Sequence, residues 1–277
     1  MTKYIDNSVE MTYNDCERGD DTMQNKFSKF VYGDKCTYKH AKGTSAFPSR
    51  EFHNYHEILL ILLLDGDVEF ISENLHMPVK PQTLIVIPKE TYHQFINEVD
   101  EEYHRCVFSF YDIPEFDELI GRCMQLPRVI EASEEQKMLF RKMNETVDSD
   151  SSESEKQILM QALLALVLSE VSHGHQTVRE GSKPSEITTK SIELINSNLC
   201  KRISIPDMAK MLNVSVSTLT QTFRKDMNIS VYQYILRKKL ILAQQKIRDG
   251  ESATSVAMNC GFNDYSSFYK QYKKMFG

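Results

Sequence analysis

The hydrophobic positions of this 277-residue chain follow a different spacing in each half. Between residues 27 and 112, short apolar runs are separated by turn residues such as Asp65-Gly66-Asp67 and Pro81-Gln82. Four of these runs predict strands, at 57–64, 68–71, 83–87 and 103–110. Several short strands at close spacing are typical of an antiparallel barrel or sandwich.

From residue 113 the apolar positions recur at helical spacing, and we expect helices at 115–124, 134–147 and 156–172. The third is apolar around most of its circumference, so it must be covered on more than one face. Two interpretations stay open: the helix is buried within its own domain, or part of it forms a subunit interface.

The last ninety or so residues contain one short pattern twice, at 204–225 and 252–274. Each copy predicts a helix, a tight turn and a second helix rich in basic residues. Gly261 supplies the left-handed turn of the second copy. The expected helix caps are Ser204, Ser215, Ser252 and Asp264, and the expected buried stripes are Leu219, Phe223 and Met227, then Phe268, Tyr272 and Phe276. This is the helix-turn-helix arrangement that enters a DNA major groove.

The second helix of each copy leaves a polar face opposite its apolar stripe. Glutamine can read adenine with two hydrogen bonds, hydroxyl groups adapt to several bases, and basic residues suit phosphates. The candidate DNA contacts are Ser217, Thr220, Gln221, Arg224 and Lys225 in the first copy, and Tyr265, Ser266, Tyr269, Lys270 and Lys273 in the second.

Residues 231–248 predict one long helix between the two copies, closed by Gly250. Its inward positions are expected to be Tyr232, Ile235, Leu236, Leu240, Ala243 and Ile247. Such a spacer can hold two reading helices about one DNA turn, ~34 Å, apart.

Charge divides the chain in the same way. The net charge of −6 is an average over residues 186–277, with 14 Lys+Arg against 7 Asp+Glu, and residues 1–185, with 19 against 32. A basic module on an acidic body is expected of a DNA-binding protein with an added domain. No apolar run approaches the ~20 residues of a membrane helix. The six cysteines form no CxxC pair, and no secretory signal follows Met1, so we expect a cytoplasmic protein.

Three segments resemble the AraC/XylS transcriptional regulators: 218–225 (Thr-Leu-Thr-Gln-Thr-Phe-Arg-Lys), 236–243 and 256–276. The resemblance covers about residues 186–277 and implies seven helices, two helix-turn-helix units and bacterial promoter binding. It also implies that Ser217, Thr220 and Gln221, then Tyr265, Ser266, Tyr269 and Lys270, face the bases. The chain departs at Asn228, where the family usually has glycine, although asparagine tolerates the left-handed conformation.

Two further segments, His53-Asn54-Tyr55-His56-Glu57 and the stretch around His93 at 88–97, resemble the two cupin motifs. This resemblance implies a small barrel that holds one ligand at its mouth. The candidate effector contacts are Tyr55, Glu57, Phe70, His93 and Phe95. His53, Glu57 and His93 match three metal-ligand positions, but such residues in regulators are more often ligand anchors or core groups. We therefore assign no metal, no cofactor and no catalytic residue.

Together the patterns predict an α+β protein. We expect a flexible arm at 1–26, a cupin-like effector-binding barrel at 27–112, a helical dimerisation segment at 113–173 and a linker at 174–185. An all-α domain of two helix-turn-helix motifs joined by a long helix follows at 186–277.

The functional hypothesis is a bacterial transcription regulator that is not an enzyme, an activator rather than a repressor, whose promoter binding a small molecule modulates. Its expected partners are double-stranded promoter DNA, the effector, RNA polymerase and a second copy of the chain, with no membrane. The alternative is a metal-dependent cupin enzyme whose helical domain docks a partner protein.

Overall fold

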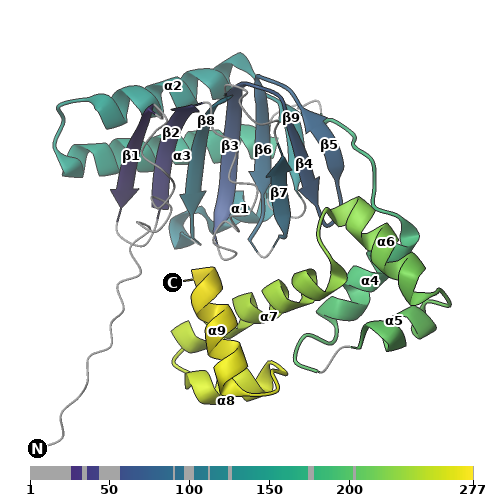
Figure 1. Ribbon diagram of the computed structural model, residues 1–277. Coiled ribbons are helices and arrows are strands. Elements are labelled where there is room, and N and C mark those ends of the chain that lie inside the picture. The colour runs from purple at the N-terminus through teal and green to yellow at the C-terminus, as the bar shows by residue number, and fades with distance from the viewer. Residues whose placement is uncertain are drawn as a thin grey trace, which may run out of the picture.

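The computed structural model describes residues 26–32, 36–43, 57–89, 91–96, 103–111, 113–123, 127–173, 178–201 and 204–276. These residues form an N-terminal part of strands and helices, followed by an all-helical C-terminal part below it in Figure 1. The α+β class expected from the sequence is therefore confirmed. Within these residues, no helix has the length and apolar character that crossing a bilayer requires.

The described strands form two antiparallel sheets rather than a closed barrel. The larger has the order β1-β2-β8-β3-β6-β9, comprising β1 Lys26–Tyr32, β2 Cys36–Gly43, β8 Tyr103–Phe110, β3 Ile58–Asp65, β6 Thr83–Ile87 and β9 Arg128–Glu131. The smaller has the order β5-β4-β7, comprising β5 His76–Val79, β4 Val68–Ser72 and β7 His93–Ile96. No ladder between described residues joins the two sheets, so the expectation of a closed barrel is wrong. The chain changes sheet at the turn after β3, where Gly66 has a φ of 89°.

Four strands fall on the four predicted runs, and the remaining ones were not predicted. β2 reads Cys-Thr-Tyr-Lys-His-Ala-Lys-Gly, too polar for an apolar run to reveal it. β9 lies inside the segment expected to be helical, because it is only four residues long and pairs with β6 at the sheet edge.

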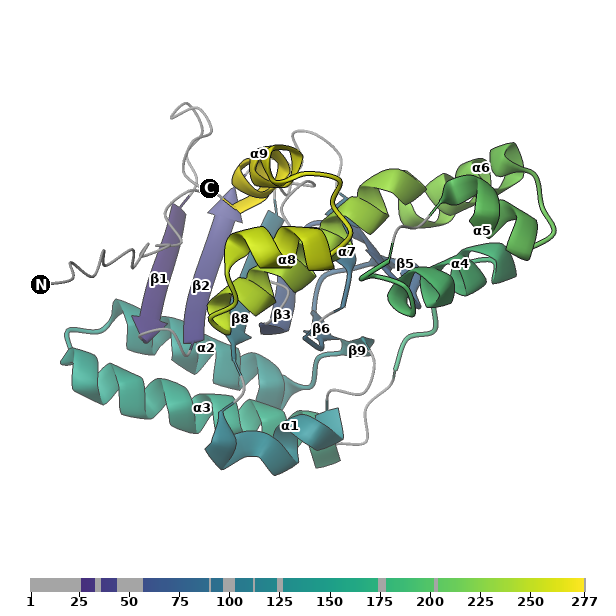
Figure 2. The same ribbon diagram turned by 90° about the horizontal axis from the view of Figure 1, so that it is seen from below.

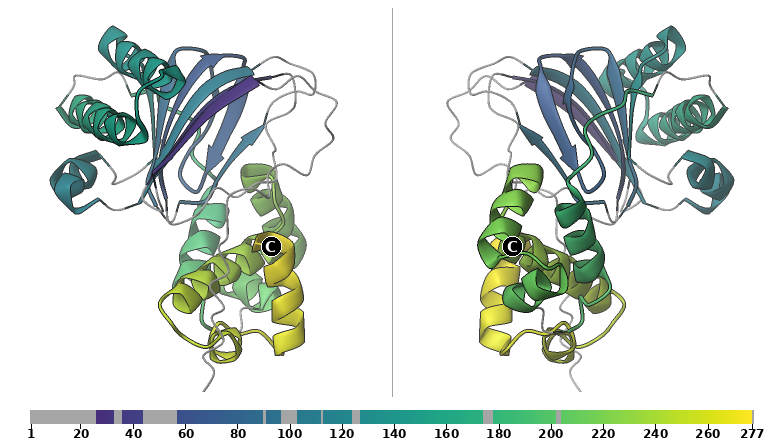
Figure 3. Two further views of the ribbon diagram at one scale, coloured as in Figure 1. Left: turned by 90° about the vertical axis from the view of Figure 1, so that its left-hand side faces the viewer. Right: turned by 90° about the vertical axis from the view of Figure 1, so that its right-hand side faces the viewer.

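Strand β3 is buried on both faces, which explains its unbroken apolar sequence. Alternate side chains point to opposite faces of a strand. Leu60 and Leu62 belong to the cluster between the large sheet and the helices, whereas Leu59, Ile61 and Leu63 belong to the cluster between the two sheets. The N-terminal part is thus three layers thick, with helices covering one outer face (Figure 3).

Those covering helices are α1 Asp117–Cys123, preceded by a 3-10 turn at Pro114–Phe116, α2 Glu134–Asp148 and α3 Glu153–His173. The first interpretation of α3, burial within its own domain, holds for only one face of the helix. Met160, Leu164 and Val167 are buried against the sheet and α2, but Ile158 and Leu166 are 66% and 53% exposed. One face of α3 is core, and another apolar face is open to solvent.

The resemblance implies seven helices, and the described residues of the C-terminal part form six: α4 Glu186–Asn196, α5 Ile205–Met211, α6 Val216–Met227, α7 Val231–Arg248, α8 Ala253–Asn259 and α9 Tyr265–Phe276. They pack around two separate apolar clusters. One contains α4, α5, α6 and the start of α7, and the other contains the rest of α7 with α8 and α9. Figure 2 shows α7 passing from the first group to the second.

Candidate nucleic-acid interface

The four helix caps expected in the repeated pattern are all present. Ser204, Ser215 and Ser252 each accept a hydrogen bond from the backbone amide three residues later, at 3.4, 3.0 and 3.3 Å. Asp264 accepts from both the amide and the hydroxyl of Ser267, at 2.7 and 2.8 Å. The amide bond from Ser267, followed by the hydroxyl bond, holds the pKa of Asp264 below its ordinary value. These caps satisfy free helix amides and set where each reading helix begins.

Left-handed backbone positions form the tight turns. Gly261 has a φ of 74°, as expected, and Asn213 has a φ of 55° in the corresponding turn of the first copy. Asn228 has a φ of 51° after α6, so asparagine takes the conformation that the family gives to glycine. The turns at Asn213 and Gly261 each bring the second helix of a helix-turn-helix unit back against the first.

The inward stripes hold α6 and α9 in place. Leu219, Phe223 and Met227 are each fully buried, as expected. Phe268 is 1% exposed and packs on Tyr272, which, like Phe276, is only partly buried at the edge of its cluster.

The prediction for Tyr232 is wrong. It is 63% exposed, and Tyr234 is buried instead. Tyr234 packs between Phe223 of α6 and Tyr92 of the N-terminal part, with ring centroids 5.3 Å away in each case.

The outward face of α6 presents the residues predicted from the first copy. Ser217, Gln221, Arg224 and Lys225 are exposed, and Thr220 is half-buried. The Thr220 hydroxyl already donates to the carbonyl oxygens of Val216 and Ser217, at 2.9 and 3.1 Å. Gln221 and the two basic residues therefore carry the polar character of this face.

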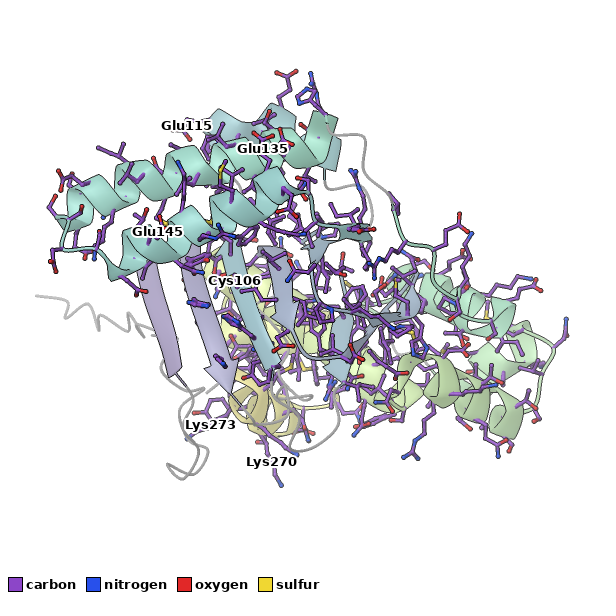
Figure 4. The ribbon with its side chains drawn as sticks, turned by 90° about the horizontal axis from the view of Figure 1, so that it is seen from above. Cys106, Glu115, Glu135, Glu145, Lys270 and Lys273 are labelled. Atoms are coloured by element: carbon purple, nitrogen blue, oxygen red, sulfur yellow. The ribbon has the colours of Figure 1, made fainter. Side chains whose placement is uncertain are left out.

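The outward face of α9 presents an aromatic pair beside two amines. Tyr265 and Tyr269 are exposed and stacked, with ring centroids 6.0 Å apart and an interplanar angle of 24°. Ser266, Lys270 and Lys273 are exposed on the same helix. Figure 4 shows Lys270 pointing away from the rest of the molecule. This face suits apolar contacts to thymine methyl groups and charged contacts to phosphates.

The N-terminal part holds α7 through a buried ion pair. Glu73, in the turn between β4 and β5, accepts hydrogen bonds from Lys238 Nζ at 2.9 Å and from the Tyr234 hydroxyl at 2.6 Å. The side chains of Lys238 and Glu73 are 6% and 14% exposed. No sequence pattern indicated this contact, because its members are 165 residues apart.

Further contacts follow the same helix. Tyr92 packs edge-on against Tyr234 at 5.3 Å and interacts electrostatically with Arg237. Burial raises the pKa of Tyr92 to about 12, against the lowering effect of Arg237. At the other end of α7, Tyr111 bonds with both Glu57 and Arg248, and burial, followed by the charge of Glu57, raises the pKa of Tyr111.

The segment before α4 is attached to the N-terminal sheets as well. His76 and Ser182 exchange two backbone hydrogen bonds of 2.9 Å each, and Ile130 forms a bridge with Val178. Ser185 then caps α4, and its amide and hydroxyl donate to Asp226 on α6 at 2.9 and 2.6 Å. The described part of the expected linker is therefore hydrogen bonded at both ends.

Of the expected effector contacts, Phe70 and Phe95 lie in the packed cluster between the sheets, with ring centroids 5.2 Å apart. His93 Nδ1 lies 3.0 Å from the carbonyl oxygen of Thr91, and burial lowers the pKa of His93 to about 4. Glu57 is buried beside Tyr111. Tyr55 lies outside the described residues.

Among the metal candidates, His53 also lies outside the described residues. Within the part of the chain that the structure describes, no group of three or more His, Cys, Asp or Glu side chains has the geometry to hold a metal ion.

Comparison with known proteins places a helix-turn-helix domain at residues 208–277. The chain is 34% identical over 84 residues to the probable transcriptional regulator LumQ of Photobacterium leiognathi, covering 30% of this chain and 34% of LumQ. It is 29% identical over 117 residues to the Msm operon regulatory protein of Streptococcus mutans, covering 42% and 41%. The matches thus span about a third to two fifths of these relatives.

Among solved structures, ToxT from Vibrio cholerae O395 is similar at 12% identity with a TM-score of 0.38, covering 92% of this chain and 94% of ToxT. Residues 208–277 include most of the first capped helix pair and all of the second. The C-terminal part of the chain therefore carries a helix-turn-helix domain, and it is similar in sequence to known transcriptional regulators.

Proposed function

We propose that this protein is a transcription regulator that binds double-stranded promoter DNA through α6 and α9. The observation that carries the proposal is the pair of capped, outward-facing helices, each with basic side chains exposed next to base-reading candidates. The joining helix α7 has 18 residues and is therefore about 27 Å long. Together with the units at its ends, it suits two successive major grooves, about 34 Å apart.

We propose further that the N-terminal part modulates this binding through α7. Three contacts support the proposal: Glu73 with Lys238, Tyr92 with Arg237, and Glu57 through Tyr111 with Arg248. Among the proposed effector contacts, Glu57 interacts with Tyr111, and Tyr111 in turn interacts with Arg248 of α7. A small molecule that bound the two arrangements of this contact unequally would shift DNA affinity.

Fewer of the described residues support the effector site than support the contact with α7. Phe70 and Phe95 are packed in the core, so a ligand reaches them only if that cluster opens. Glu57 and His93 are the polar candidates among the described residues. By resemblance, we also propose an activator that contacts RNA polymerase.

A homodimer through α3 is the remaining part of the proposal. Ile158, Ala162 and Leu166 form an exposed stripe four residues apart on that helix. A surface groove of about 340 Å³ lies on one side, against Ile113 and Phe116, and one of about 390 Å³ lies on the other, against α2. An apolar ridge between two grooves fits the same surface of a second copy related by two-fold symmetry.

The DNA-reading assignment is tested with Gln221→Ala and Lys273→Ala in titrations over a salt series. We expect Gln221→Ala to reduce discrimination at one base pair by roughly 1–3 kcal/mol, because a bidentate base contact is lost. Lys273→Ala should weaken binding to all sequences alike and lower the log–log salt slope by about 0.9, the contribution of one phosphate contact. Lys80→Ala, which removes an exposed charge between β5 and β6, is the matched control. Uniform loss of affinity in both variants would show that the reading faces are wrongly assigned.

The role of Glu73 is tested with Glu73→Gln, which leaves Lys238 buried without its charged partner. We expect a loss of roughly 2–4 kcal/mol in unfolding free energy and faster amide exchange in residues 231–240. Glu69→Gln is the control, since Glu69 belongs to β4 but makes an exposed pair with His76 at 3.7 Å. If exchange in α7 is the same in both variants, Glu73 does not couple the two parts.

The dimer is tested with Leu166→Glu in sedimentation velocity. A carboxylate in the centre of the apolar stripe would be desolvated in the interface, so we expect monomers at concentrations where the unmodified chain is dimeric. Ser154→Glu adds the same charge at an exposed position near the start of α3 and should leave the dimer intact. A Leu166→Glu chain that remains dimeric would exclude this face.

A further inference from the structure

Cys200 and Cys260 lie where the two helix-turn-helix units meet. Cys200 is exposed in the turn after α4, and Cys260 is fully buried at the end of α8. Their sequence neighbours form a close backbone crossing. Lys239 Nζ donates to the carbonyl oxygens of Lys201 and Gly261, at 2.9 and 3.4 Å. A Cβ placed on Gly261 would lie 3.2 Å from the same Lys201 oxygen.

The charges of two lysines of α7 act on both thiols. Lys239 and Lys246 both interact electrostatically with Cys200 and with Cys260. The pKa of Cys260 is raised to about 11, first by burial and then by Cys200, against lowering by Lys246 and Lys239. The thiolate is the form of a cysteine that reacts with oxidants.

We propose that Cys200 and Cys260 form a reversible disulfide that ties the turn after α4 to the end of α8. A hydroperoxide is the oxidant. The Cys200 thiolate attacks one peroxide oxygen, the O–O bond breaks, and the other oxygen leaves as water or an alcohol, giving a sulfenic acid. The Cys260 thiol then attacks that sulfur and gives up its proton, and the hydroxyl group leaves with that proton as water. Two thiols are oxidised and one peroxide is reduced, and an external thiol reverses the reaction.

The disulfide would change the packing of α8, the helix against which α9 packs. Cys260 belongs to the apolar cluster that α8 and α9 share with Ala257 and Phe268. Drawing its sulfur toward Cys200 moves α8 relative to the first unit. Because α9 packs on α8, the two reading helices would lose their common spacing. This consequence rests on the proposed DNA-binding function, whereas the bond itself does not.

The bond is tested by peptide mapping of the full chain after treatment with hydrogen peroxide and blocking of remaining thiols. Trypsin releases Cys200 in peptide 191–201 and Cys260 in peptide 249–270, since no Lys or Arg interrupts either. We expect a joined species about 2 Da lighter than the two free peptides together, which dithiothreitol separates. Cys200→Ser and Cys260→Ser should each abolish it, and Cys36→Ser, in the N-terminal sheet, should not. Recovery of both peptides with blocked thiols, or of Cys200 joined to another chain, would overturn the proposal.

The consequence is tested by DNA titration of the same samples. We expect the oxidised chain to bind its specific site about tenfold more weakly, within the usual range of coupling between sites. Dithiothreitol should restore affinity, and Cys200→Ser should not respond to peroxide. Equal affinity of the mapped disulfide form and the reduced form would overturn the effect on DNA. A reduced chain that binds no DNA would contradict the proposed function and leave the peptide map to decide the bond.

Discussion

The buried ion pair between Glu73 and Lys238 fixes how the two parts of the chain meet. A charge on α7 that is only 6% exposed has to be compensated, and the compensating carboxylate comes from the opposite part of the molecule. The same carboxylate accepts from the Tyr234 hydroxyl, so one side chain of the β4–β5 turn fixes two successive turns of the helix. Any change in the arrangement of the two parts has to break or replace these bonds.

Helix α7 also divides the C-terminal part. Its first turns close the cluster of α4, α5 and α6, and its later turns close the cluster of α8 and α9. Two small cores on one rigid helix explain why the reading helices keep a defined separation. They also explain why a contact on α7, or the proposed disulfide between Cys200 and Cys260, would reach both units at once.

Local rules account for what the sequence predicted well. Caps such as Ser215 and Asp264, and the left-handed turns at Asn228 and Gly261, depend on residues within a few positions of one another. The buried stripe of α6 follows from helical spacing alone. The polar faces of α6 and α9 were predicted for the same reason, because they are the positions opposite the buried stripes.

The failures depend on partners far away in sequence. Helical spacing predicted that Tyr232 points inward, but Tyr234 is covered instead, by Phe223 of α6 and by Tyr92 of the N-terminal part. Strand β2 is polar because its apolar contacts come only from alternate residues such as Tyr38, and β9 is too short to show a period. The barrel was expected from strand spacing, which does not say how the ladders pair. The burial of Lys238 could not be predicted, because Lys238 lies in a run of basic residues that all look alike in the sequence.

The central claim is that one chain reads two successive major grooves. Hydroxyl-radical footprinting on a promoter fragment selected from bacterial genomic DNA tests this most directly. For each bound copy we expect two protected patches on one face of the duplex, about 10 base pairs apart. A single patch per copy, or no protection at concentrations that retard the fragment, would contradict it.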